Sequence, residues 1–305
     1  MIGRRFAGYE VDALLGKGGM AEVHRATVAD GPLAGRVVAL KRLRPALAND
    51  PAYVALFRRE AELTRRLHHP ACIEVLDAGV ADGTPYIAME LVDGRNLRQI
   101  LGQCAARGIL LPPDFGCYVA LVLAGALEHA HAGVDPEGRP LGLVHCDLSP
   151  SNVFISKLGD IKLGDFGVAL SPGATKGLLG PGALGKVRYL APEQLLGRPV
   201  TPRTDLFALG AVLFELLTDR PAFEGADATA IGRAILEGRL RAPSELRPEL
   251  PFELDHLVLR CLTTDPADRW ESAGAFGAEI AARYDPTVGT PLAIAAVVRG
   301  LFGVR

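Results

Sequence analysis

The amino-acid sequence predicts an α+β fold in two parts, a small antiparallel sheet with one main helix followed by a larger, mainly helical region. Strand-like alternation of apolar residues runs from Tyr9 to about Ala88, and one helical pattern interrupts it. From Asn96 onward the periodicity is helical. The chain has 305 residues, of which 49% are hydrophobic, and can therefore bury a sizeable core.

The first part is predicted to consist of short strands around a helix at residues 51–67. The helix carries one set of residues on a single inward face, namely Leu56, Glu60, Leu63 and Leu67. Strands are expected at residues 11–15, 23–28, 37–43, 73–80 and 85–91. The turn-forming residues Val92, Asp93 and Gly94 then predict a hinge.

The second part is predicted to be a set of helices separated by Pro-rich or Gly-rich turns. They are expected at residues 113–131, 203–218, 226–236, 254–261, 272–284 and 290–302. Pro113 is suited to a first helical turn. Residues 206–217 contain Glu215 and are interpreted as a buried core helix, and the last helix is amphipathic.

Two short motifs carry the chemistry. Residues 145–152 have the sequence HCDLSPSN, and residues 165–167 have the sequence DFG, with two predicted short strands between them at 153–156 and 160–163. Asp147 can accept a hydroxyl proton, while Asn152 and Asp165 can hold Mg²⁺ against phosphates. Capping before a turn is an alternative for a single Asp, but it does not explain all three residues at this spacing. The pattern predicts phosphoryl transfer.

At these motifs the chain resembles a bacterial eukaryotic-type (Hanks-type) serine/threonine protein kinase. Residues 15–23, LGKGGMAEV, resemble the glycine-rich loop over the ATP phosphates, and residues 38–41, VALK, resemble the strand with the phosphate-binding lysine. Residues 191–193, APE, resemble the end of an activation segment. The insert at 135–140, together with Ser149, is similar to kinases of myxobacteria.

The resemblance covers nearly the whole chain and implies a two-lobed protein-kinase-like fold. The implied kinase domain spans residues 1–305, with an N-lobe at 1–91, a C-lobe at 92–285 and a C-terminal helical extension at 286–305. ATP would lie in a cleft between the lobes.

The resemblance implies that Lys41, paired with Glu60, binds the α- and β-phosphates. Glu62 is the rival partner, but Glu60 lies on the inward face of the predicted helix and Glu62 does not. The loop glycines would let backbone approach phosphate oxygens. An ordinary glycine-rich hairpin is the alternative for the loop, and Lys41 at family spacing favours the phosphate site. Ala21 stands where the third glycine is usual.

The family pattern also implies contacts to the adenine base and to a metal ion. Met89 would be the gatekeeper, and the backbones of Glu90 and Val92 would bind adenine. Asn152 and Asp165 would be the Mg²⁺ ligands. The expected residues of the ATP and Mg²⁺ site are Leu15, Gly16, Lys17, Gly18, Gly19, Met20, Ala21, Val23, Ala39, Lys41, Met89, Glu90, Val92, Asn152, Phe154 and Asp165.

Further matches concern the support of the site and its class. Asp205 is expected to accept hydrogen bonds from the backbone of the catalytic loop, and Glu193 to pair with Arg269. His145 and Phe166 are interpreted as core residues rather than as ligands. Small-molecule kinases with a related fold usually lack the APE segment, so its presence favours a protein substrate.

The first departure from the family pattern concerns regulation. Position 146 is Cys where most members have an Arg that receives a phosphorylated activation loop. The loop, residues 168–190, offers only Ser171, Thr175 and Tyr189 as hydroxyls. Both halves of a phosphorylation switch are therefore depleted. A redox sensor and a small buried residue are the two interpretations of Cys146, and the second is favoured.

The second departure is paired. Serine/threonine kinases place Lys two residues after the catalytic Asp, and Thr after the Gly of the substrate-facing loop. Here these positions hold Ser149 and Lys186. An exchange would restore an ammonium group and a hydroxyl at the same spot, which makes Lys186 a candidate catalytic residue. A solvated Lys186 is the alternative.

Composition restricts the partners and the compartment. The net charge of −2 gives no reason to propose nucleic acid or an anionic membrane as a partner. The five cysteines are scattered without a C-x-x-C motif, which favours a reducing cytoplasm. The N-terminus lacks an apolar signal segment, and no window approaches the roughly 18 apolar residues of a spanning helix.

These observations together predict a cytoplasmic, ATP- and Mg²⁺-dependent protein serine/threonine kinase in bacterial signalling, with Asp147, Lys41, Glu60 and Lys186 as catalytic residues. The alternatives are a nucleotide-binding pseudokinase scaffold and a small-molecule kinase. Lys41, Asp147, Asn152 and Asp165 are all present, which disfavours the pseudokinase. The sequence carries no signal for a particular oligomeric state.

Overall fold

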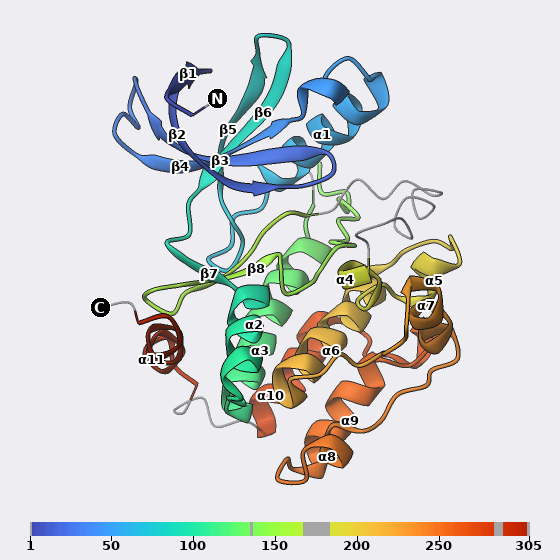
Figure 1. Cartoon of the computed structure of the whole chain (residues 1–305). Helices are drawn as coiled ribbons and strands as arrows, with labels where there is room; N and C mark the ends of the chain where they lie inside the picture. Colours follow the sequence, from blue (N-terminus) through green and yellow to red (C-terminus); the bar gives the residue numbers. More distant parts are fainter. Residues whose placement is uncertain (1, 135–136, 167–183, 284–288, 304–305) are drawn as a thin grey trace. The chain divides into compact units, whose positions relative to one another are not determined.

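The computed structural model describes residues 2–134, 137–166, 184–283 and 289–303 (Figure 1). The chain divides into two compact units, Met1–Val92 and Asp93–Arg305. The first is a sheet with one main helix and the second is mainly helical, so the predicted α+β fold class is confirmed.

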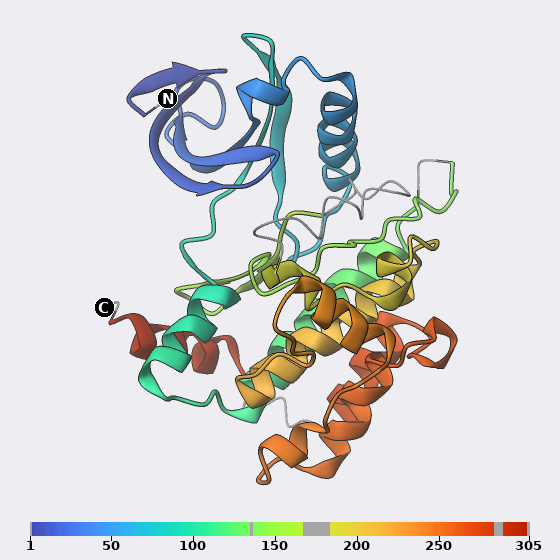
Figure 2. The ribbon, with the colours of Figure 1, turned by 45° about the vertical axis from the view of Figure 1, so that its right-hand side comes forward.

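Unit 1 is built on a six-stranded antiparallel sheet in the order β1-β2-β3-β4-β6-β5. Alternate residues of a strand point to opposite faces, so Val38 and Leu40 of β4 join one apolar cluster, while Leu43 joins another beneath the helix α1. Figure 2 shows α1 beside the curled sheet, where it contacts β5 and β6. The strands are β1 Arg4–Phe6, β2 Tyr9–Lys17, β3 Ala21–Val28, β4 Val37–Leu43, β5 Val75–Ala81 and β6 Thr84–Glu90.

The helix α1, Pro51–Thr64, begins where the sequence predicts it. The Asp50 carboxylate caps it by accepting a 2.9 Å hydrogen bond from the Ala52 N–H, and Pro51 occupies the first turn. The helix ends three residues before the predicted boundary at 67. Its buried face also differs from the predicted one, because Leu56 and Leu63 are only half-buried. The buried residues are Phe57, Glu60, Ala61 and Thr64.

Unit 2 is organised around α3 and α6, which pack against each other. Nearly all of α6 is buried, as predicted for an apolar core helix. Within the described residues, no helix combines the length and apolarity that crossing a bilayer requires. The helices are α2 Leu97–Arg107, α3 Pro113–His131, α4 Leu184–Val187, α5 Pro192–Leu195, α6 Pro202–Thr218, α7 Ala228–Leu236, α8 Pro243–Leu246, α9 Phe252–Cys261, α10 Ala273–Arg283 and α11 Pro291–Phe302, with 3-10 turns at Pro45–Leu47 in unit 1 and Pro266–Asp268 in unit 2.

A three-stranded sheet in unit 2 carries the motif residues. It has the order β7-β8-β9, with β7 Gly94–Asn96, β8 Val153–Ser156 and β9 Ile161–Leu163. The sequence placed Gly94 in a turn, but it begins β7 and pairs with Ser156. A β-carbon at Gly94 would lie 1.8 Å from the Ile155 carbonyl oxygen, so only glycine fits.

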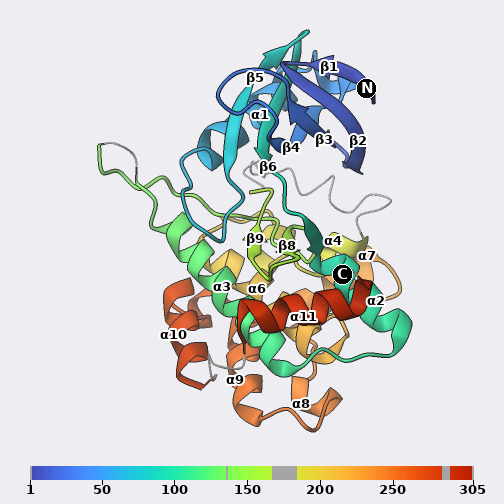
Figure 3. The ribbon, with the colours of Figure 1, turned by 90° about the vertical axis from the view of Figure 1, so that its left-hand side faces the viewer.

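The last helix, α11, belongs to unit 2 and contacts α2 and β8 (Figure 3). The Thr290 hydroxyl caps it by accepting a hydrogen bond from the Ala293 N–H, and Gly303 ends it in the left-handed conformation. Its buried face is Ile294, Ala295, Val298 and Leu301, which matches the predicted amphipathic helix.

Candidate phosphoryl-transfer site

Lys41 and Glu60 form a buried ion pair in unit 1. Lys41 lies on the same face of β4 as Leu43, and this face is covered by α1, whose inner side carries Glu60. The Lys41 Nζ atom lies 2.6 Å from Glu60 Oε1, and the two residues are only 8% and 6% exposed. The rival, Glu62, is on the outer side and pairs with Arg66 at 3.1 Å. The structure therefore selects Glu60 as the partner of Lys41.

The glycine loop connects β2 to β3. None of Gly16, Gly18 and Gly19 has a positive φ, and a β-carbon on any of them would meet no atom closer than 3.5 Å. The fold of unit 1 thus does not itself require glycine here. Bare backbone with open space beside it is what a phosphate group needs for close approach.

The residues flanking the glycine loop are placed as follows. Ala21, which replaces the usual third glycine, has its methyl group buried in the cluster with Leu43 and Phe57. The Lys17 Nζ atom lies 3.3 Å from Glu22 Oε1. Met20 is partly buried and packs against the same cluster as Ala21. Leu15 is half exposed.

The residues expected at adenine share one face of the sheet. Ala39 is the register partner of Met89, and Val23 is the partner of Lys41, so all four point the same way. Ala39 and Met89 are buried, and Val23 is half-buried. The Glu90 N–H already donates to the Glu74 carbonyl at 2.9 Å. From its backbone, Glu90 can therefore offer the adenine base only the carbonyl oxygen. Val92, at the end of unit 1, and Phe154 of β8 in unit 2 are half-buried.

Unit 2 brings Asp147, Asn152 and the ends of β8 and β9 together. The Asn152 side-chain amide donates to the Asp147 carbonyl at 2.8 Å and to the Asp147 carboxylate at 3.1 Å. Asn152 precedes β8 and Asp165 follows β9, and the pairing of Val153 with Leu163 brings these ends close. The Gly164 N–H donates to the Asn152 carbonyl at 2.9 Å.

This arrangement suits a magnesium ion held jointly by protein and nucleotide. With its amide nitrogen on Asp147, Asn152 has its amide oxygen left for a metal. Among the described residues no group of three or more His, Cys, Asp or Glu side chains could hold a metal alone. Mg²⁺ typically uses one or two protein ligands together with substrate phosphates, so the Asn152 and Asp165 oxygens fit this ion.

His145 and Phe166 are core residues, as predicted. His145 is fully buried, and its ring lies 4.6 Å from that of Phe166. Its Nδ1 accepts from the Asp147 N–H at 3.2 Å, so the hydrogen is on Nε2, which donates to the Gly164 carbonyl at 3.1 Å. This neutral histidine links the segment before Asp147 to the segment before Asp165.

Asp205 fixes the backbone of residues 145–146, at the start of the segment 145–152 that is called the catalytic segment from its expected role, and this confirms the predicted contact. Its carboxylate accepts from the N–H groups of His145 at 2.7 Å and Cys146 at 2.8 Å. The sequence did not indicate that His131 Nε2 would also contact this carboxylate, at 2.7 Å. Cys146 has φ of +62°, a conformation that a non-glycine residue keeps only where its surroundings enforce it.

The Cys146 side chain is buried. Burial raises the pKa of its thiol far above the ordinary value, and the carboxylates of Asp205, Asp147 and Glu193 add to the rise. A redox sensor needs an accessible thiolate, so the interpretation as a small buried residue is supported. Of the loop hydroxyls, Ser171 and Thr175 lie outside the described residues.

Tyr189 and Glu215 are buried and form, with the partly exposed Arg98, a polar cluster that the sequence did not reveal. The Tyr189 hydroxyl donates to the Glu215 carboxylate and accepts from Arg98. Arg98 also contacts Glu215 directly at 2.9 Å. The one available signal was Glu215 itself, a charged residue in an otherwise apolar core helix. Tyr189 is only 4% exposed, so its hydroxyl is not presented for modification.

Lys186 of α4 reaches the carboxylate of Asp147, the expected catalytic base. Its Nζ atom lies 2.5 Å from Asp147 Oδ2. Ser149, its counterpart in the predicted exchange, is buried.

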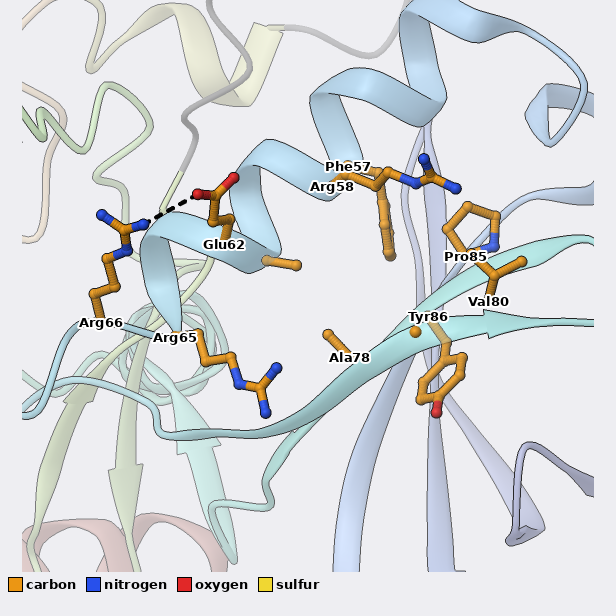
Figure 4. Close-up of a pocket in the computed structure, with 11 residues that line it drawn as sticks. Phe57, Arg58, Glu62, Arg65, Arg66, Ala78, Val80, Pro85 and Tyr86 are labelled. Atoms are coloured by element: carbon orange, nitrogen blue, oxygen red, sulfur yellow. Dashed lines mark hydrogen bonds and ion pairs between the residues drawn. The ribbon is translucent and has the colours of Figure 1, made fainter.

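The cavity of Figure 4, of about 470 Å³, is not part of this site. It lies in unit 1 between α1 and the strands β5 and β6. Phe57 and Pro85 give it apolar walls, and Arg58 and Arg65 line it as well. Lys41 and Glu60 are not among its lining residues.

Comparison with known proteins agrees with this geometry. The model of the family described as protein kinase domain matches residues 9–278. A probable serine/threonine-protein kinase of Streptomyces coelicolor is 39% identical over 98% of this chain and 44% of its own length. The tyrosine-protein kinase MasK of Myxococcus xanthus is 37% identical over 86% of this chain and 41% of its own.

Further similar proteins include the serine/threonine-protein kinase PrkC of Bacillus subtilis, which is 35% identical over 93% of this chain and 42% of its own length. The chain thus spans less than half the length of these curated relatives. The crystal structure of the Mycobacterium tuberculosis PknI kinase domain covers 92% of this chain and 97% of that one, with 32% identity and a TM-score of 0.68.

Proposed function

Because the chain belongs to the protein kinase domain family, we propose that it is an active kinase that transfers the γ-phosphoryl group of ATP to serine or threonine hydroxyls of proteins. The observation that carries the proposal is the Asp147–Asn152 contact, in which the amide of Asn152 donates to both the backbone and the carboxylate of Asp147. This contact holds a base ready for a hydroxyl proton and has an amide oxygen left for a metal ion.

Each set of residues has a defined task in the proposed reaction. Lys41, held by Glu60, binds the α- and β-phosphates, and the backbone of the glycine loop lies against phosphate oxygens. Asp147 orients the acceptor hydroxyl and takes its proton. Asn152 and Asp165 hold Mg²⁺, which, when bound, neutralises negative charge on the phosphates. Val23, Ala39, Met89 and Phe154, with the backbones of Glu90 and Val92, bind adenine.

A protein substrate is favoured over a small molecule. The APE segment, typical of protein kinases, is anchored by hydrogen bonds of 2.8 and 2.9 Å between Glu193 and Arg269. Of the curated relatives named above, one is a serine/threonine kinase, one is described as a probable serine/threonine kinase and one is a tyrosine kinase, so the acceptor hydroxyl is a matter for direct measurement. We propose serine or threonine, in bacterial signalling in the cytoplasm, where ATP is available and the five buried cysteines remain reduced.

The test uses the purified chain with γ-labelled ATP, Mg²⁺ and a generic basic protein. We expect label on serine and threonine after acid hydrolysis, and loss of at least about 10²-fold in kcat/KM for Asp147→Asn. Asp160→Asn is the matched control, because Asp160 is an exposed residue of the β8–β9 turn whose carboxylate accepts a hydrogen bond from the Ser156 hydroxyl. Label on tyrosine alone would change the acceptor class. Nucleotide binding without any transfer would replace the proposal by the pseudokinase scaffold.

A further inference from the structure

The ion pair between Lys186 and Asp147 is hard to explain by stability alone. The Nζ–Oδ2 distance is 2.5 Å, but the Lys186 side chain is 49% exposed and that of Asp147 is 24% exposed. An exposed pair of this kind contributes little to the free energy of folding, because solvent screens it and the lysine side chain loses rotamer freedom. A long side chain held against the proposed catalytic base, Asp147, therefore points to a role in the reaction.

The backbone beneath Lys186 is anchored by buried groups. Its carbonyl accepts from the Tyr189 N–H at 3.1 Å, and the next residue, Val187, is fully buried. Tyr189 is fixed by Glu215. The Gln194 amide donates to the Cys146 carbonyl at 2.9 Å, which ties this stretch to the catalytic segment directly before Asp147. The position of Lys186 near Asp147 thus follows from packing of the core.

Ser149, two residues after Asp147, cannot supply a charge. It is only 2% exposed, and its hydroxyl has no hydrogen-bond partner among the residues that the structure describes. A buried hydroxyl without a partner costs free energy and gives nothing back to the fold of this segment. Residues 145–152 contain no Lys or Arg, and the ammonium group that contacts Asp147 in the described part of the chain belongs to Lys186 of α4.

We propose that Lys186 supplies a further positive charge to the phosphoryl-transfer step, next to Asp147, an inference that rests on the proposed kinase activity. Asp147 Oδ2 accepts from both Lys186 and Asn152, which leaves Oδ1 for the substrate hydroxyl. The hydroxyl oxygen forms the new P–O bond, the bond between the γ-phosphorus and the β,γ-bridging oxygen breaks, and the proton passes to Asp147. The Lys186 ammonium stabilises the charge on the transferring group.

The test compares Lys186→Ala with Lys157→Ala. Lys157 is the matched control, because it is a lysine of similar exposure, 43%, paired with a different carboxylate, Asp93, at 3.0 Å. We expect kcat of Lys186→Ala to fall by about 10²-fold, as for removal of one preorganised charge donor, while the affinity for ADP and the melting temperature stay unchanged. Lys157→Ala should keep the wild-type rate.

A second variant distinguishes a catalytic role of Lys186 from a purely structural one. Adding Ser149→Lys to Lys186→Ala returns an ammonium to the catalytic segment and should recover at least about tenfold in kcat, because the two sites are coupled rather than additive. A structural role for Lys186 would give no such recovery. Wild-type rate in Lys186→Ala, with an active wild-type protein, overturns this inference alone. An inactive wild-type protein overturns the proposed function and the inference with it.

Discussion

Arg269 holds Glu193 through two parallel hydrogen bonds, from Nη1 to Oε1 at 2.8 Å and from Nη2 to Oε2 at 2.9 Å. The Arg269 side chain is fully buried, and its guanidinium also lies 5.0 Å from the Phe207 ring. Burial of Glu193 opposes its ionisation, but the hydrogen bonds and charge of Arg269 outweigh burial and lower the pKa of Glu193 below its ordinary value of 4.5. The pair is therefore ionised at neutral pH.

The lowered pKa of Glu193 predicts a loss of stability in acid. Its contribution is fully present above the unfolded pKa of about 4.5 and is lost progressively as pH falls through the lower folded-state pKa. Glu193→Gln should cost about 3–5 kcal/mol at pH 7, since it leaves Arg269 buried without a counter-charge. In Glu193→Gln the free energy of unfolding should also fall less steeply than in the wild-type protein as the pH drops below about 4.5. Urea unfolding of the wild-type protein and of Glu193→Gln, measured from about pH 3 to about pH 7, checks this. Parallel declines of the free energy of unfolding in the two proteins would contradict it.

Lys41→Met should lower kcat/KM for ATP by at least about 10²-fold, because the clamp on the phosphates and the positioning of the reacting group act as one unit. Glu60→Gln should lower it as well, by removing the carboxylate that holds Lys41. Glu62→Gln provides the control, since Glu62 lies on the outer side of α1 and pairs with Arg66. Steady-state kinetics with varied ATP would measure all three. A loss in Glu62→Gln equal to that in Glu60→Gln would show that the pairing is misassigned.

Activity should not depend on phosphorylation of the activation loop. Cys146 offers no positive charge to a phosphate, and the Tyr189 hydroxyl is committed to Glu215 and Arg98. Protein treated with phosphatase, or carrying Ser171→Ala together with Thr175→Ala, should keep most of its activity in the transfer assay. A large loss that re-phosphorylation restores would mean that another basic group receives a loop phosphate.

The spacing of apolar residues predicted the main strands and helices well, because in each of them this spacing shows which face is buried. The Lys41–Glu60 pair followed from the inward position of Glu60 in the helix pattern, although the buried face is centred on Phe57 and Ala61 rather than on the leucines. The strand β7 was missed, since a three-residue strand has too few side chains to show alternation.

Contacts that depend on distant segments were beyond the sequence. The left-handed conformation of Cys146 is enforced by Asp205, which lies far along the chain, and nothing at position 146 signals it. The contact between His131 and Asp205 likewise joins residues far apart in the chain, and no local pattern signals it. The approach of Lys186 to Asp147 was predicted only from the paired departure at positions 149 and 186, because periodicity carries no information on which side chains meet across a fold.

The close contact between Gly159 and Pro291 joins the β8–β9 turn to α11, the last helix of unit 2. The family match ends at residue 278, yet a β-carbon at Gly159 would lie 1.8 Å from the Pro291 carbonyl oxygen. Gly159 sits in the turn of the β8–β9 hairpin, whose opposite ends carry Asn152 and Asp165. A side chain at position 159 would therefore displace either the β8–β9 turn or the start of α11, so the packing of the last helix depends on a glycine in the hairpin whose opposite ends carry Asn152 and Asp165.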